Sequence, residues 1–462
     1  STAPPPLRLP AAAAQLHARL GALLVELCAS GRVCGGVQAC VRRNGVTLAE
    51  AAAGFRGVAD PRPLLASSPM ALLELSNLLA VLALHALVKA DTSLTYQTPL
   101  AQLWPQLGAK YGRTATLRDA LSHKVPLPPP PRDVLLSAAA LANLPARQAD
   151  LEDGPGGGAD SGTASAAPPV PPAPPAPPAP SRGPVGSSGL LPALEPRSTG
   201  LSHGWLLAGL VQRARGGKAY ADLLPELLAP LEGVWAGPLP ADVADDAALV
   251  SSGFAATLKR LAPAMDAPAA PAAPPTSAAT APSATTAAAD ASSTSAAAAA
   301  SAPAASSTPA FDAGAGAAMA MRDVLINAGV VNGATVRGAC VPGLSAFGTA
   351  SGVCSLIGGA AALAPSGAWE VRCGVEPSEM FGERSWGLGL QRYERRGGQG
   401  GPLLGLHSFG GSVALFDPRS GLSVAVLLND QQLDYAATRE VLALVAAELK
   451  LGQLSFLENG FF

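Results

Sequence analysis

His407-Ser408-Phe409-Gly410-Gly411-Ser412, followed directly by VALFDPRSGLSVAVLLND, is the segment that says most about the architecture of this chain. Its apolar residues form two short runs separated by the turn Asp417-Pro418-Arg419-Ser420-Gly421, which predicts two neighbouring strands. A second segment, LLELSNLLAVLALHALV, is apolar on most sides. It predicts a buried central helix over about Met70 to Lys89.

The segments around these two predict an antiparallel sheet with helices packed against it. GGVQACVRR and VTLAEAAAG flank Asn44-Gly45, a strong two-residue turn signal, and predict a hairpin. Helices are expected in AAAAQLHARLGALLVELCAS, from Thr116 onward, on both sides of Gly216-Gly217, through SGVCSLIGGAAAL and in TREVLALVAAELK. WGLGLQRYER and PLLGLHSFGG are expected as further strands. The order of these elements predicts an α+β fold.

Two low-complexity stretches divide the chain into three blocks, at about 10–149, 190–262 and 319–462. The stretch at 150–189 is rich in proline and the stretch at 263–318 is almost entirely Ala, Ser, Thr and Pro, so neither can bury much surface. We expect both to be disordered insertions in surface loops of a single domain spanning 10–462. The alternative is that they separate independent domains.

Composition limits the partners that the chain can have. Its 462 residues are 48% hydrophobic and 14% charged, with a formal net charge of -2. These values allow a substantial core but provide no basic stripe for a nucleic acid. Arg42-Arg43 and Arg395-Arg396 are isolated pairs, which we expect on the solvated surface.

The six cysteines form no C-x-x-C pattern, and several lie in apolar or strand-like runs where buried thiols are expected, which weakly favours a reducing compartment. No metal or other cofactor is predicted. No uninterrupted apolar run is long enough for a membrane span. Because the sequence begins at Ser1, we expect a processed protein or a piece of a longer one.

Several motifs, in their order, resemble the β-lactamase and penicillin-binding-protein family of serine hydrolases. They are GVQACVRRNG, AAGFRGVADPRP, PLAQLWPQL, SHGWLLAGLV, WGLGLQRY and HSFGGS. The resemblance implies a β-lactamase/transpeptidase-like fold with an all-helical insert, nearest to the class C-like branch. It is greatest to the domain at the C-terminus of plant and algal atypical (aarF-related) kinases. That relationship implies a possible kinase domain in cis and a chloroplast or mitochondrion of a green alga.

The resemblance also implies where a catalytic site would lie. The family's nucleophile motif is S-x-x-K, and Ser76-Asn77-Leu78-Leu79 stands in its place. The motif puts serine and lysine on one face of a helix, so that the amine can activate the hydroxyl. Leu79 cannot accept a proton. Ser76 is therefore either a residual nucleophile or simply a small residue near a helix start.

The other two family motifs are also altered. Gly200 replaces the expected tyrosine and Ser202 the expected asparagine, with His203 as a neighbouring titratable group. In the strand motif His407 and Ser408 are retained, and the resemblance places an oxyanion donor at Phe409 or Gly410, followed by Gly411. Phe409 could instead fill the cleft, and the glycines could simply form a tight strand edge. His123, in LSHKVPLP, matches a histidine that is structural in the family.

These substitutions predict a pseudoenzyme that acts in binding, scaffolding or regulation, with an unknown small molecule or peptide in the old cleft. The alternative is a weak serine esterase or amidase with Ser76 as nucleophile and His407 or His203 as base. In a third interpretation the alignment is displaced and Ser67-Ser68 or Ser93 is the relevant serine, although no lysine follows them at the required spacing.

Overall fold

The computed structural model describes residues 11–127, 130, 134, 137–153, 200–228, 231–252, 328–378, 382–396, 401–408, 410–432 and 434–454. By compactness the chain divides into a unit of residues 1–257 with 325–462 and a unit of residues 258–324, and the second unit lies outside the described residues. The insertion predicted at 263–318 also lies outside them. Of the one predicted at 150–189 only the first residues are described, and they continue a helix to Asp153.

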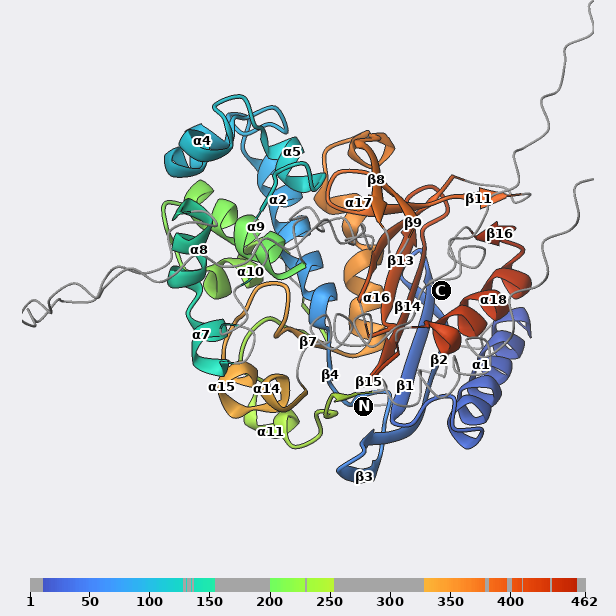
Figure 1. Cartoon of the computed structure of the whole chain (residues 1–462). Coiled ribbons are helices and arrows are strands. Elements are labelled where there is room, and N and C mark those ends of the chain that lie inside the picture. The colour runs from blue at the N-terminus through green and yellow to red at the C-terminus, as the bar shows by residue number, and fades with distance from the viewer. Residues whose placement is uncertain are drawn as a thin grey trace, which may run out of the picture. The chain divides into compact units, whose positions relative to one another are not determined.

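One antiparallel sheet of nine strands organises the described unit, as predicted (Figure 1). Along its β14 strand Val424 and Val426 face one hydrophobic cluster while Ala425 and Leu427 face another, so both sheet faces are covered. The strands, in spatial order, are β3 (Asp60–Pro63), β2 (Val46–Gly57), β1 (Gly36–Arg43), β14 (Leu422–Leu428), β13 (Val413–Asp417), β12 (Leu403–His407), β10 (Gln391–Tyr393), β9 (Gly382–Trp386) and β8 (Gly374–Ser378).

The predicted hairpin is confirmed as β1 and β2, which pair from Arg43 and Val46 outward. The turn residues Asn44 and Gly45 both have positive φ, at 51° and 79°. A two-residue type I′ turn needs positive φ at both central positions, which is why Asn-Gly is such a strong signal.

Helices cover the two faces of the sheet (Figure 1). α1 (Ala11–Ala29) and α18 (Ala436–Leu449) pack on one face through rows of leucine and valine such as Leu20, Leu24 and Val441. α16 (Ala350–Gly358) packs against β1, β13 and β14 on the other face and shares its hydrophobic cluster with α2 (Asn77–Ala90). Both terminal helices were predicted from their apolar spacing, and both are confirmed.

The central helix begins later than predicted. Met70–Ala71 form strand β4, which pairs with β7 (Phe347–Gly348), and a 3₁₀ turn, η1 (Leu73–Ser76), precedes α2. The prediction of helix from Met70 was wrong because a strand partner far along the chain captures these residues. Leu73–Ala90 is long and apolar enough to cross a membrane by composition, but 72% of it is buried within the structure, and a core helix passes the same test.

The remaining helices include those of the predicted helical insert. α5 starts at a capping box formed by Thr116 and Asp119, and α9 and α10 flank the turn at Gly216-Gly217 as predicted. Their bounds are α3 (Leu100–Leu103), α4 (Pro105–Tyr111), α5 (Leu117–Leu121), α7 (Ala138–Ala142), α8 (Leu144–Asp153), α9 (Gly200–Ala214), α10 (Tyr220–Leu228), α11 (Ala241–Ala244), α14 (Ala328–Asn332), α15 (Ala334–Arg337), α17 (Ala360–Leu363) and η2 (Ala368–Glu370).

Short strand pairs complete the unit. β5 (Val234–Trp235) joins β7 and β4 in a three-stranded sheet. β6 (Ser251–Ser252) pairs in parallel with β15 (Asp430–Gln431), and β11 (Arg395–Arg396) pairs with β16 (Gln453–Leu454). The β4–β7 pair brings residues 346–348 beside the start of α2.

Candidate active site

Ser76 is the last residue of η1 and directly precedes α2. The residue is 2% exposed, and its Oγ accepts a hydrogen bond from the backbone N–H of Ala346 at 3.2 Å. The neighbouring N–H of Leu72 donates to the carbonyl of Ala346 at 2.8 Å. The Ser76 hydroxyl therefore connects the start of α2 to the segment before β7 through a hydrogen bond.

Leu79 lies one helical turn after Ser76, where the resemblance expects a lysine. It is 2% exposed and belongs to the apolar core cluster. Within the described part of the chain, the bond from Ala346 is the hydrogen bond that the Ser76 side chain makes. No basic side chain is therefore hydrogen-bonded to this hydroxyl among the residues that the structure describes.

α9, which begins at Gly200, approaches the same helix start. A Cβ added to Gly204 would lie 2.6 Å from Oδ1 of Asn77, the residue after Ser76, so this helix contact requires glycine. Ser202 and His203 are both buried, at 1% and 2% exposure. The helix that carries Gly200, Ser202 and His203 thus contacts the Ser76 segment through Gly204.

His203 is held in a stack of aromatic rings. Its Nε2 donates to the carbonyl of Ala120 at 2.9 Å, and its ring centroid lies 3.6 Å from that of His123. His123 in turn lies 4.0 Å from Trp386. Burial lowers the pKa of His203 to about 4. It also lowers the pKa of His123 well below its usual value, with further contributions from His203 and Arg384.

His407 ends β12 and is half-buried. Its Nδ1 is hydrogen-bonded to Oη of Tyr393 at 2.7 Å. Burial of the ring, followed by the nearby charge of Arg384, lowers the pKa of His407 well below its usual value, so the imidazole is neutral at pH 7. The hydrogen bonds described for Ser76 do not include one to His407.

Backbone groups of the turn between β12 and β13 are hydrogen-bonded to one another. The N–H of Ser408 donates to the carbonyl of Ser412 at 2.8 Å, and the N–H of Gly411 donates to the carbonyl of Ser408 at 3.1 Å. A Cβ at Gly410 would lie 3.5 Å from Cδ1 of Leu73, which places the turn against η1. Phe409 lies outside the described residues. The N–H of Gly411 is therefore already committed and cannot serve as an oxyanion donor in this conformation.

Of the other serines considered as nucleophiles, Ser67 is exposed, and Ser68 and Ser93 have local roles. Ser68 is fully buried and its Oγ accepts from the N–H of Leu65, while the Oγ of Ser93 donates to Asp91 in the loop after α2. No cluster of three potential metal ligands occurs among the described residues. The catalytic assignments of Ser76 and His407 stay predictions.

The sequence interpretation was wrong about Arg395. Its side chain is 2% exposed rather than solvated, and it pairs with Asp417, whose side chain is 1% exposed, at 2.8 Å. The ion pair joins strand β11 to the end of β13. Because these two segments are separate in the sequence, the Arg395-Arg396 dipeptide alone could not predict it. The same pair lines a cavity whose other walls also carry arginines.

Comparisons with known proteins agree on the fold. The family model for Beta-lactamase matches residues 22–448. A penicillin-binding protein homologue from Caulobacter crescentus is similar in structure, with a TM-score of 0.59, 19% identity, and 96% of this chain and 98% of that chain covered.

Two similar structures are described as enzymes. A family VIII carboxylesterase has a TM-score of 0.59 at 13% identity, with 94% of this chain and 97% of that chain covered. A D-amino acid amidase from Ochrobactrum anthropi SV3 has a TM-score of 0.55 at 14% identity, with coverage of 94% and 99%. A search of curated proteins found no match.

Proposed function

The chain belongs to the beta-lactamase family, and from that premise we propose that it is a member without hydrolytic chemistry that acts in binding, scaffolding or regulation. One observation carries the proposal. The Ser76 hydroxyl is buried against a backbone N–H, and the residue one turn later is Leu79. A serine of this fold becomes a nucleophile only when a neighbouring base takes its proton.

The two histidines near the site are poor substitutes for that base. The pKa of His203 is lowered to about 4 by burial, and its Nε2–H is donated to Ala120. The pKa of His407 is lowered well below its usual value, and its Nδ1 is engaged by Tyr393. A general base works best with a pKa near the operating pH, so both imidazoles would be weak bases at pH 7.

The context of the proposed role comes from the sequence resemblance. It favours the class C-like branch and, within it, a domain attached to an aarF-related atypical kinase in a chloroplast or mitochondrion. In such a chain the domain would position or regulate the kinase, or hold a small molecule or peptide near Ser76.

A second candidate function is a weak serine esterase or amidase. Ser76 stands at the start of the central helix, and similar structures include a carboxylesterase and an amidase. The function would require Ser76 to leave its bond with Ala346 and a histidine to turn toward it.

Reaction with a fluorophosphonate probe separates the two candidates. Wild type, Ser76→Ala and Ser67→Ala, which changes the exposed serine of the displaced alignment, would be incubated with the probe and read by intact mass, with circular dichroism to verify folding. We expect no label on the folded wild-type protein. Labelling that persists in Ser67→Ala but vanishes in Ser76→Ala would replace the pseudoenzyme with the esterase. Labelling lost only in Ser67→Ala would support the displaced alignment.

A further inference from the structure

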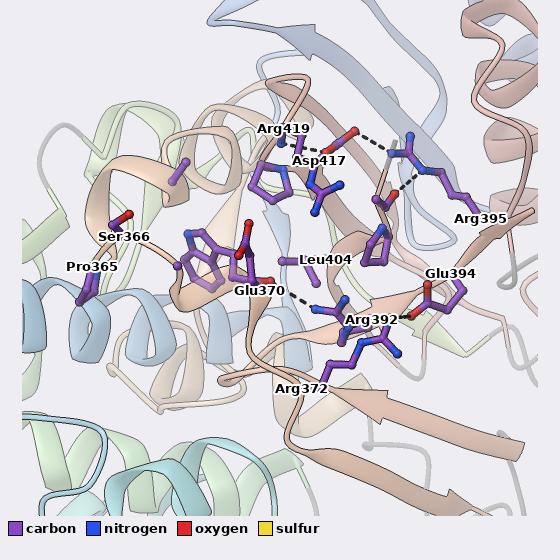
Figure 2. A pocket seen from close by; sticks show the side chains of 16 residues that line it. Pro365, Ser366, Glu370, Arg372, Arg392, Glu394, Arg395, Leu404, Asp417 and Arg419 are labelled. Atoms are coloured by element: carbon purple, nitrogen blue, oxygen red, sulfur yellow. Dashed lines mark hydrogen bonds and ion pairs between the residues drawn. The ribbon is translucent and has the colours of Figure 1, made fainter. Parts of the chain in front are cut away.

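A cavity of about 570 Å³ lies away from the candidate active site (Figure 2). Its walls come from the segment between α17 and β8, from β10 and β11, from the start of β12 and from the turn between β13 and β14. This volume lies within the range of small-molecule sites in proteins. Trp369 and Leu404 give it apolar wall, and most of the other long side chains that line it are charged.

Two elements link this cavity to the Ser76 region while keeping the two apart. The ring centroid of His85 in α2 lies 4.3 Å from that of Trp369 in the cavity wall. His85 follows Ser76 by nine residues, or about 13 Å along a helix. Leu404 in the cavity wall precedes His407 by three residues on β12, or about 10 Å along a strand.

Positive charge in the cavity is incompletely paired. Four arginines and three carboxylates line it. The buried pair of Arg395 and Asp417 accounts for one of each, which leaves three arginines and the two carboxylates of Glu370 and Glu394. Glu394 Oε1 lies 3.6 Å from Nη2 of Arg372 and 3.9 Å from Nε of Arg392, both beyond hydrogen-bonding distance. Two guanidinium groups therefore share one carboxylate loosely, as Figure 2 shows.

Arg392 is the deepest of these groups. Its side chain is 5% exposed, Nη1 donates to the carbonyl of Trp369 at 3.2 Å, and the buried Nε has no hydrogen-bond acceptor among the described residues. Burial lowers the pKa of Arg392, and the positive charges of Arg372 and Arg419 lower it further. A buried guanidinium with an unaccepted donor and only a distant carboxylate costs free energy, and an anion in the adjoining cavity would offset part of that cost through its charge.

We propose that this cavity binds a small molecule through a phosphate or carboxylate group, with Arg392 as the buried anchor and Arg372 and Arg419 at the exposed rim. Guanidinium groups present forked donors that match both oxyanions. Arg419 lines the cavity and is exposed, so its guanidinium is accessible from solvent. The proposal holds whether or not Ser76 is reactive.

Isothermal titration of the intact chain with phenyl phosphate and with benzoate, at ionic strength matched with chloride, tests the proposal. The key variant is Arg372→Gln/Arg419→Gln, because both residues are exposed and their loss should not disturb the core. Arg215→Gln removes an exposed arginine that does not line the cavity and serves as the matched control. Arg392→Lys keeps the buried positive charge but removes the paired N–H donors of the guanidinium group.

We expect one of the two probes to bind wild type and Arg215→Gln equally, and the double variant about tenfold or more weakly. Phenyl phosphate alone would assign a phosphate ligand, and benzoate alone a carboxylate. The proposal is overturned if neither probe binds wild type, or if the double variant binds as well as Arg215→Gln. Folding of Arg392→Lys is checked first, and an undiminished affinity in that variant would remove Arg392 as the anchor.

Discussion

The hydroxyl of Ser76 accepts a 3.2 Å hydrogen bond from the backbone N–H of Ala346, a residue 270 positions later in the chain. The bond fastens the start of α2 to the segment that enters β7. Ser76→Ala would leave this buried N–H without its acceptor. We therefore expect the free energy of unfolding, measured by urea denaturation, to fall by about 1–3 kcal/mol.

Ser67→Ala provides the comparison, because Ser67 is exposed and close in sequence. Its free energy of unfolding should change by less than about 0.5 kcal/mol. Equal stability of Ser76→Ala and wild type would contradict a structural role for the Ser76 hydroxyl.

Buried histidines make stability depend on pH. Burial lowers the pKa of both His85 and His203 to about 4, with 0% and 2% of each residue exposed. Nε2 of His85 donates to the carbonyl of Leu388 at 2.9 Å, so its Nδ1 accepts from Tyr96 at 2.6 Å and has no room for a proton. Below about pH 6.5 these histidines become protonated in the unfolded chain, whereas in the folded protein they stay neutral down to about pH 4.

Stability should therefore fall as pH falls from 6.5 toward 4, by about 2 kcal/mol per buried histidine between pH 6.5 and 5. Urea denaturation at several pH values measures this slope. His85→Gln lowers stability at pH 7 but flattens the slope, because one titrating group is gone. His203→Gln should flatten the slope in the same way, because burial lowers the pKa of that imidazole to about 4 as well. A slope that His85→Gln does not alter would contradict the burial of a neutral imidazole.

Local sequence patterns predicted the elements that local interactions specify. Asn44-Gly45 allows only a narrow set of turns, and the leucine spacing of α1 and the apolar face of α18 are properties of single segments. The prediction of where the central helix starts was wrong because that start depends on a residue pairing far along the chain. Met70–Ala71 pair with Phe347–Gly348, and nothing near residue 70 specifies that partner.

In the candidate site, too, features of single short segments could be predicted from the sequence, and contacts between distant segments could not. Leu79 and Gly200 were predicted as substitutions in family motifs from short segments of sequence, and both assignments stay predictions. The partner of Ser76 could not be predicted, since Ala346 belongs to a distant part of the chain. Arg395 was expected in solvent because its charge partner, Asp417, lies on another strand, and burial of an ion pair depends on both residues.

Two helical glycines should respond in opposite directions to alanine. A Cβ at Gly209 in α9 would lie 2.3 Å from Cζ3 of Trp104, a fully buried ring that also lies under Arg213 at 3.4 Å. Gly209→Ala must displace that ring and should lower the melting temperature by several degrees.

Gly21 in α1 has nothing within 4 Å of an added Cβ, so Gly21→Ala gains helix propensity and should raise stability by about 0.5–1 kcal/mol. Thermal unfolding of both variants checks the pair of predictions. Destabilisation by Gly21→Ala would mean that α1 packs differently, and tolerance of Gly209→Ala would mean that Trp104 is not fixed against α9.

Removing one partner of the buried pair of Arg395 and Asp417 should lower stability mainly because the other partner is then a buried, unpaired charge. The attraction between the two charges contributes less to stability. Burial alone would raise the pKa of Asp417, but the N–H of Arg419, the hydroxyl of Ser420 and the guanidinium of Arg395 together hold it below its usual value. The carboxylate is thus ionised at pH 7. Asp417→Asn would leave Arg395 charged and unpaired with its side chain 2% exposed, at a cost of about 3 kcal/mol in unfolding free energy.

A double-mutant cycle distinguishes that cost from a loss of packing. Arg395→Gln should also destabilise, but Arg395→Gln/Asp417→Asn should be more stable than the sum of the two single effects predicts, because no buried charge is left over. The exposed pair of Lys218 and Glu226 gives a matched control, since Glu226→Gln should change stability little. Additive effects at Arg395 and Asp417 in urea denaturation would mean that the two charges do not interact in the folded protein.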